Sequence, residues 1–177
     1  MKTLLTGLIL IGLFISAATS AQGNFVGVGY AQLESEDVET GNLVLSGGHI
    51  TEKGFGFEVF YALTVSEDSL SVGGFSADIT LDSLGVLAVY KTPTDVYDTY
   101  LKVKGGFATV DLEFDFDELG SLSDNTSGLA FGIAVGTRLG PGALEFSYMV
   151  LPEFDEFEGI EVDAETNMLS LGYLWDF

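Results

Sequence analysis

The last nine residues of this 177-residue chain alternate large apolar side chains with mostly small or polar ones. Successive side chains of an extended strand point to opposite faces, so the pattern predicts one continuous apolar face. Soluble proteins rarely end on such a face, whereas a strand between lipid and a barrel lumen requires one. The tail therefore predicts a transmembrane β-strand whose apolar face consists of Leu169, Leu171, Tyr173, Trp175 and Phe177.

Residues 1–21 have the pattern of a cleaved secretory signal peptide. Lys2 supplies a positive charge, residues 4–15 are apolar, and Thr19-Ser20-Ala21 offers small residues at the cleavage site. The alternative is a membrane-anchor helix, but the apolar run is shorter than the roughly 18 residues that a spanning helix needs. Residues 22–177 then form one domain, and the absence of cysteine excludes disulfide and thiol chemistry.

The remaining chain divides into eight segments with period-two alternation. Three links are short and contain Gly or Pro, while four are longer and acidic, which is the pattern of outer-membrane barrels with short periplasmic turns. An even number of strands places both termini on the periplasmic side. We therefore expect an all-β, eight-stranded antiparallel transmembrane barrel with strands at about 24–33, 41–50, 55–64, 83–90, 99–110, 129–139, 143–150 and 169–177.

Charge is distributed unevenly along the chain. The net charge of −21 argues against nucleic-acid binding, which needs basic patches. The four long links hold 21 of the 27 acidic residues. Six charged residues instead have the parity of the lumen, and their balanced signs predict an ion-pair network, because unpaired buried charges are costly. The alternative for the two lysines is that they snorkel toward water. The six are Glu58, Lys102, Lys104, Arg138, Glu145 and Asp176.

In the long links the alternation continues with its chemistry inverted. After residue 110 the outward positions become acidic, at Asp111 and Glu113, while the inward positions stay apolar, at Leu112 and Phe114. This inversion is expected of strands that leave lipid and enter water without losing their pairing. It predicts a sheet that projects beyond the bilayer around a small apolar cap.

Two sets of residues raise the question of a metal or catalytic site. Asp111, Glu113, Asp115 and Asp117 are candidates for weak Ca²⁺ or Mg²⁺ binding, although a solvated acidic face is the favoured explanation and an EF-hand loop would need Gly where Phe116 stands. His49 is the only histidine, and its parity places it outward near a periplasmic turn. A histidine-dependent lipid A deacylase would need a serine partner that the sequence does not reveal.

Several stretches resemble the small eight-stranded outer-membrane barrels, such as the OmpA transmembrane domain and the OmpX-type proteins. They are Gly27-Val28-Gly29-Tyr30, Gly47-Gly48-His49, Phe57-Glu58-Val59-Phe60-Tyr61 and Ser170 to Phe177. The resemblance implies a closed barrel with an ion-paired interior. It also implies that the carboxy-terminal aromatics Tyr173, Trp175 and Phe177 are recognised by the barrel-assembly machinery. The family's roles in envelope integrity, adhesion or host contact become expectations for this chain.

The sequence thus favours a non-enzymatic outer-membrane protein without a cofactor. Its expected partners are membrane lipid, lipopolysaccharide and the assembly machinery, with Ca²⁺ or Mg²⁺ as candidates at the acidic links. A narrow porin-like channel for ions or small solutes is the main alternative, followed by a lipid A-modifying enzyme. A soluble lipocalin-like barrel is the structural rival, and it would tolerate charge on the outward faces.

Overall fold

The computed structural model describes residues 23–36, 38–72, 75–92, 98–116, 120–157 and 160–177. The expected signal peptide, residues 1–21, lies outside these ranges. No helix within the described ranges has the length and apolar character needed to cross a membrane.

The described chain consists of antiparallel strands joined by turns and links. Two residues other than glycine have a positive φ, Glu36 and Asp98, and both lie outside the strands. The strands are β1 (Asn24–Ser35), β2 (Val38–Ile50), β3 (Phe55–Ser66), β4 (Asp68–Val72), β5 (Phe75–Lys91), β6 (Thr99–Phe116), β7 (Gly120–Leu139), β8 (Gly142–Phe157) and β9 (Ile160–Asp176).

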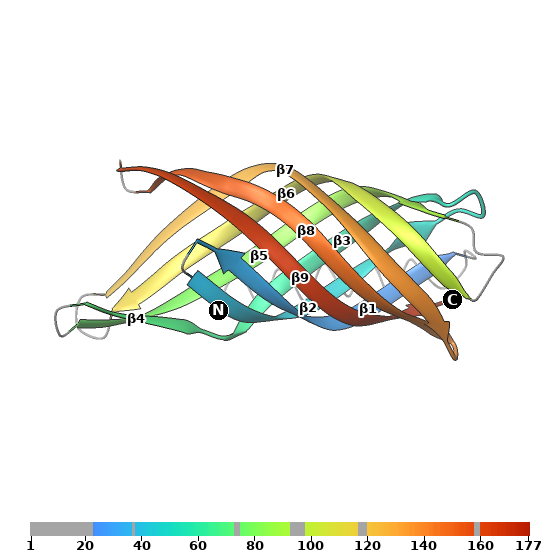
Figure 1. The fold of residues 1–177 in the computed structure, drawn as a ribbon, viewed down its shortest axis with the longest axis horizontal. Helices are drawn as coiled ribbons and strands as arrows, with labels where there is room; N and C mark the ends of the chain where they lie inside the picture. The colour runs from blue at the N-terminus through green and yellow to red at the C-terminus, as the bar shows by residue number, and fades with distance from the viewer. Residues whose placement is uncertain (1–22, 37, 73–74, 93–97, 117–119, 158–159) are drawn as a thin grey trace.

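Eight of these strands close into a barrel, which confirms the expected fold class. Neighbours in the sheet follow the order β3-β2-β1-β9-β8-β7-β6-β5, and β3 pairs with β5 to complete the ring. β4 pairs only with the first residues of β5 and forms a short hairpin outside the ring. Figure 1 shows the steep tilt of the strands around the long axis of the barrel.

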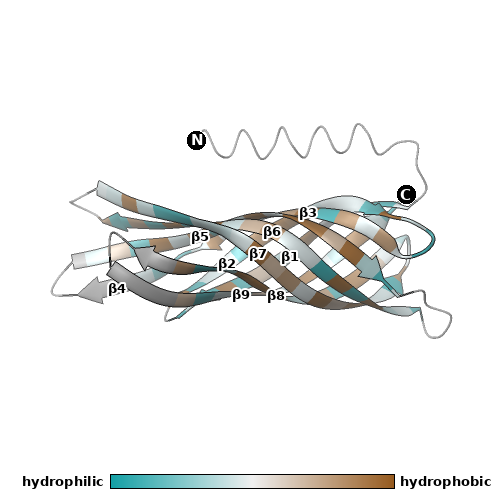
Figure 2. Ribbon diagram, turned by 90° about the horizontal axis from the view of Figure 1, so that it is seen from above, coloured by the Kyte–Doolittle hydropathy of each residue, from teal (hydrophilic) through white to brown (hydrophobic). Residues whose placement is uncertain are grey.

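The outward face is apolar along the middle of the barrel. Brown, hydrophobic residues recur along the strands there in Figure 2. Large apolar side chains are exposed on every barrel strand; examples are Val86, Phe107, Ile133 and Phe146, with 57%, 67%, 56% and 45% of their surface accessible. An apolar surface of this extent has no place in water, because it is far larger than the patches that soluble monomers expose. We call this surface the apolar belt.

The strands are longer than the sequence suggested at one end of the barrel. The acidic links continue as paired strand on β5, β6, β7, β8 and β9, and we call this the projecting end; the opposite end, with the short turns, is the turn end. β7 pairs with β8 only up to Phe131 and Val150. Beyond that point the β7–β8 ladder stops and the pairs β6–β7 and β8–β9 diverge, as Figure 1 shows, although Thr126 Oγ1 still donates a hydrogen bond of 2.7 Å to Glu153 O. Pro152 lies on β8 at the separation and has no N–H with which to continue the ladder.

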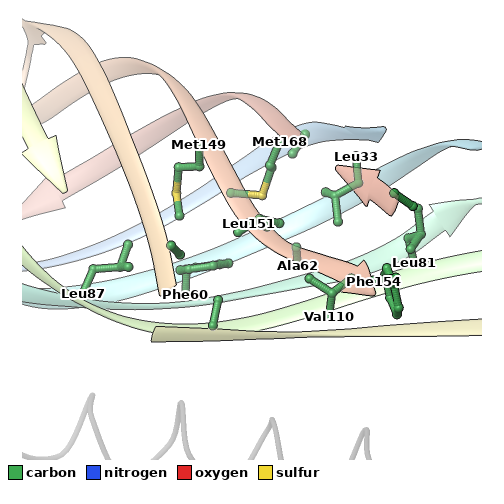
Figure 3. Packing of buried hydrophobic residues seen from close by; sticks show 14 of the residues in the cluster. Leu33, Phe60, Ala62, Leu81, Leu87, Val110, Met149, Leu151, Phe154 and Met168 are labelled. Carbon is green, nitrogen blue, oxygen red and sulfur yellow. The ribbon is translucent and has the colours of Figure 1, made fainter. Parts of the chain in front are cut away.

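The interior is packed toward the projecting end by apolar side chains. Alternate residues of the strands contribute to one buried cluster, shown in Figure 3, which extends from Phe60 and Met149 to Leu81, Val110 and Phe154. An interior of eight strands is just wide enough for side chains to fill. The cluster fills the lumen on this side, and Leu112 of the predicted cap packs against it, whereas Phe114 is half-buried and is not part of it.

The apolar belt predicts a depth-dependent penalty for charge. Ile133 and Asn125 are both exposed outward residues of β7, but Ile133 lies within the belt and Asn125 at the projecting end. We expect Ile133→Arg to lower the free energy of unfolding by about 2–4 kcal/mol in lipid vesicles. Asn125→Arg should change it by no more than about 0.5 kcal/mol. Urea titration of tryptophan fluorescence measures both, and equal effects would contradict a lipid-facing belt.

Candidate functional site

Four charged side chains meet inside the barrel from three different strands. Glu58 comes from β3, Lys102 and Lys104 from β6, and Glu145 from β8. Lys102 and Lys104 are two residues apart, so both point to the lumen while Val103 between them points outward. All four side chains are buried, and Lys102 has no accessible surface. The lysines therefore do not snorkel to water.

The four groups form a closed ring of alternating charge. Lys102 Nζ lies 2.7 Å from Glu145 Oε2 and 3.2 Å from Glu58 Oε2. Lys104 Nζ lies 2.9 Å from Glu58 Oε1 and 3.1 Å from Glu145 Oε1. Each ammonium therefore contacts both carboxylates, and the ring carries no net formal charge. We call these four residues the ion-pair ring.

Neutrality is what makes the ion-pair ring tolerable in the lumen. Removing a charge from water costs several kcal/mol, and mutual attraction compensates only when each group has a well-placed partner. Here every carboxylate oxygen has an ammonium within 3.2 Å. Loss of one member would leave an uncompensated buried charge, so the ring couples β3, β6 and β8 across the barrel.

Tyr100 completes the ring and was missed by the sequence analysis. Its hydroxyl donates a hydrogen bond of 2.7 Å to Glu145 Oε2, and its ring lies 4.0 Å below Lys91 Nζ in a cation–π contact. The signal was present in the sequence, because Tyr100 has the same parity as Lys102 and Lys104. A tyrosine two positions from a lumen lysine points to the same face of the strand, so it is a candidate partner for a buried carboxylate.

Glycines on neighbouring strands make room for the large lumen side chains. A Cβ atom added to Gly136 would overlap the Tyr100 ring, and one added to Gly85 would overlap the Phe60 ring. In each case the glycine is the direct cross-strand partner of the large residue. The lumen therefore pairs large residues with glycine across strands, which repeats at Phe25–Gly48, Gly132–Met149 and Gly27–Leu174.

Arg138 and Asp176 lie outside the ion-pair ring, contrary to the expected six-membered network. Both have lumen parity, but both sit at the last positions of their strands at the turn end, where their side chains are exposed. Neither forms an ion pair within the described part of the chain. Parity identifies the face of a strand but not the depth along the barrel, which is the reason for the difference.

The acidic candidates for a metal site do not converge. Asp111, Glu113 and Asp115 follow one outer face of β6, and Asp117 lies outside the described residues. Within the described ranges, no group of three His, Asp or Glu side chains could hold a metal ion. Asp82 is the cross-strand partner of Asp111. Partial burial, and then the Asp82 carboxylate, raise the pKa of Asp111.

The remaining candidates are placed at the turn end. His49 is half-buried, and its Nδ1 lies 2.9 Å from Asn24 Oδ1. Tyr173 and Trp175 stack edge-on with centroids 4.8 Å apart, and Trp175 and Phe177 are exposed on the outward face. Aromatic residues at this level of a membrane barrel form the interfacial girdle.

The comparisons with known proteins agree with this geometry. No protein-family model and no curated protein matches the sequence. Among solved structures, Neisserial surface protein A is similar with a TM-score of 0.64 and 17% sequence identity; the match covers 89% of this chain and 98% of the surface protein A chain. The Ail protein of Yersinia pestis is similar with a TM-score of 0.60 and 17% sequence identity; the match covers 88% of this chain and 100% of the Ail chain. OprG of Pseudomonas aeruginosa is similar with a TM-score of 0.61 and 14% sequence identity; the match covers 88% of this chain and 97% of the OprG chain.

The chain has the fold of the small outer-membrane β-barrels. The similarity spans most of the chain and nearly all of each neighbour, and at these identities it concerns the fold. The apolar belt is the surface that such a barrel presents to lipid. A bacterial outer-membrane location agrees with both observations.

The ion-pair ring predicts strong coupling between Lys104 and Glu58. Lys104→Met leaves two carboxylates with one ammonium, and we expect it to lower the free energy of unfolding by about 3–5 kcal/mol. Adding Glu58→Gln restores neutrality and should recover part of this loss. The double-mutant cycle is measured by urea unfolding in vesicles, and strictly additive effects would contradict the ring.

The space under Tyr100 predicts different tolerances at two glycines. Gly136→Ala should cost about 1–3 kcal/mol, because the new methyl group overlaps the Tyr100 ring. Gly105→Ala is the control, since its Cβ would meet nothing closer than 3.5 Å and faces outward beside Phe131. Gly105→Ala should be neutral or stabilising by up to about 1 kcal/mol. Equal destabilisation in the urea titration would refute the packing argument.

Proposed function

We propose that this protein is a non-enzymatic integral protein of the bacterial outer membrane, with an envelope-structural and surface-contact role. The observation that carries the proposal is the filled lumen. The ion-pair ring occupies the part nearer the turn end, and the apolar cluster from Phe60 to Phe154 occupies the side toward the projecting end. A barrel that is filled in this way acts through its surfaces rather than as a conduit.

Charge at the projecting end supports contact with cationic groups. Asp78 faces Asp115 across β5 and β6, and Asp82 faces Asp111, with Glu113 between them on the same outer face. Carboxylates placed directly opposite one another repel, so a cation between this surface and an anionic partner lowers its free energy. We propose contact with lipopolysaccharide phosphates bridged by Ca²⁺ or Mg²⁺.

The similar Ail protein makes an instructive contrast. Ail has been crystallised in complex with sucrose octasulfate, a heparin analogue and therefore a polyanion. The acidic projecting end of this chain would repel such a ligand. Adhesive contact, where this protein makes it, is therefore expected with basic rather than sulfated surfaces.

The carboxy-terminal strand has a further expected partner. We propose that the barrel-assembly machinery recognises Tyr173, Trp175 and Phe177 during insertion. The support is their arrangement on one outward face at the edge of the apolar belt, beside the amino-terminal strand that β9 joins to close the barrel.

There are two competing hypotheses for the function: a lipid A-modifying enzyme and a narrow ion channel. His49 contacts Asn24, whereas a lipid A deacylase would need a histidine that activates a serine. A narrow ion channel is favoured by one observation, the presence of buried charged groups in the lumen. Mass spectrometry of lipid A in cells with and without the protein tests the first hypothesis.

The filled lumen predicts no steady ion conductance. Purified protein reconstituted in planar bilayers should give no unitary current steps at neutral pH, because ions would have to cross the apolar cluster without hydration. Insertion is verified on the same sample by heat-modifiable electrophoretic mobility. Reproducible current steps in proportion to the inserted protein would favour the channel and overturn the closed-lumen function.

The acidic outer face predicts an effect of Mg²⁺ that depends on lipopolysaccharide. In vesicles that contain lipopolysaccharide, millimolar Mg²⁺ should raise the urea midpoint of the wild-type protein. The variant Asp111→Asn/Glu113→Gln/Asp115→Asn should show little increase, because the bridging carboxylates are gone. Phosphatidylcholine vesicles provide the control, and the same increase in both proteins would contradict cation-bridged contact.

A further inference from the structure

A small cavity lies beside the ion-pair ring in the lumen. Its volume is about 40 Å³. Glu58, Lys104 and Glu145 line one part of it, and Ser46, Ser147 and Ser170 of neighbouring strands line another. Apolar side chains, among them Phe60, Met149 and Met168, complete the wall. The small serine side chains leave the space, and the charged groups and hydroxyls supply its polar partners.

Ser147 has a hydroxyl group that lacks a partner in the described structure. Its side chain is buried, with 3% of the residue accessible, and its Oγ makes no hydrogen bond there. Other buried polar side chains of the lumen are satisfied. Asn42 Nδ2 donates to Leu81 O at 2.6 Å, and Ser83 Oγ donates to Thr109 O at 3.1 Å. An unsatisfied buried hydroxyl is unfavourable, so a partner inside the cavity is expected.

The charges beside the cavity restrict what that partner can be. Two carboxylates and one ammonium group of the ion-pair ring line the cavity, and Lys102 balances the remaining charge from within the ring, so the ring as a whole offers no net charge to attract an ion. Each carboxylate oxygen has two lone pairs and each ammonium three N–H donors, so the ring can still donate and accept. A neutral molecule that both donates and accepts hydrogen bonds fits these requirements.

Size narrows the choice further. A cavity needs roughly 10–15 Å³ to hold one water, so this cavity has space for about two to four waters. We propose that it is a binding site for a small cluster of ordered water molecules, which join Ser147 Oγ to Lys104 and Glu145. The ion-pair ring is then hydrated from within the barrel, while the apolar cluster separates these waters from the projecting end. This inference stands independently of the proposed function.

The test uses NMR spectroscopy of the folded protein in lipid nanodiscs. Cross-peaks between water and the backbone amides of Ser147 and Ser170, with the sign of a bound molecule, are expected in the wild type. The variant Ser147→Ala removes the hydroxyl and keeps the space, so peaks that survive at residue 147 arise from water and not from hydroxyl exchange. Peaks that vanish in Ser147→Ala would overturn the proposal, as would their absence in the wild type.

A second pair of variants locates the water. Ser147→Val fills the cavity with methyl groups and should remove the cross-peaks at Ser170. If Ser147→Val does not fold, Ser170→Val fills the same cavity from the adjacent strand β9, where Ser170 is the cross-strand partner of Ser147, and should remove the cross-peaks at Ser147. Ser83→Val is the matched control, because Ser83 is a buried lumen serine bonded to Thr109 and does not line the cavity. It should leave the peaks at Ser147 and Ser170 unchanged. Peaks that persist after the cavity is filled would place the water elsewhere and contradict the proposal.

Discussion

The requirement that every backbone N–H and C=O in hydrocarbon be paired within the protein governs the rest of this structure. With no water in the bilayer core, a sheet can cross only when it has no free edge. The pairing of β3 with β5 meets that requirement by closing the ring. Closure divides the side chains of each strand between lipid and lumen, and the strict period of two in the sequence is its consequence.

Closure also creates an interior that must be filled. An interior of eight strands is narrow enough for side chains to fill most of it, and this chain fills it with two different kinds of side chain. Toward the projecting end the filling is apolar, from Phe60 to Phe154, and nearer the turn end it is the ion-pair ring. Cross-strand glycines below Tyr100 and Phe60 allow large groups to fit. The neutral ring links three strands across the lumen, which a uniformly apolar filling would not do with the same directional specificity.

Period-two alternation predicted the barrel, the outward faces and the four residues that the structure brings together in the ring. The alternation gives face without depth, so it groups Arg138 and Asp176, which are exposed at the turn end, with residues that are buried farther along the lumen. Tyr100 has the same parity as its lysine neighbours, but the balance of charged residues does not indicate an aromatic partner.

The limits of the strands were also harder to predict than the strands themselves. The acidic links continue as paired strands because water can solvate an outward carboxylate without breaking the ladder. The predicted segments therefore stopped short on β5 to β9. Two features of the projecting end are not part of the period-two pattern and depend on which strands pair, although Pro152 marks the second of them locally. They are the hairpin of β4 with β5 and the separation of β7 from β8 beyond Val150.

Fluorescence quenching of the single tryptophan, Trp175, tests the lipid-facing surface most directly. Trp175 lies on the outward face near the turn end with 40% of its surface exposed. In vesicles with nitroxide-labelled lipids, we predict strong quenching by a label near the headgroup and weaker quenching by a label deep in the acyl chains. In the variant Trp175→Phe/Asn125→Trp, the tryptophan lies at the projecting end and should respond mainly to aqueous iodide. A wild-type tryptophan that is quenched by iodide and by neither lipid label would contradict the account.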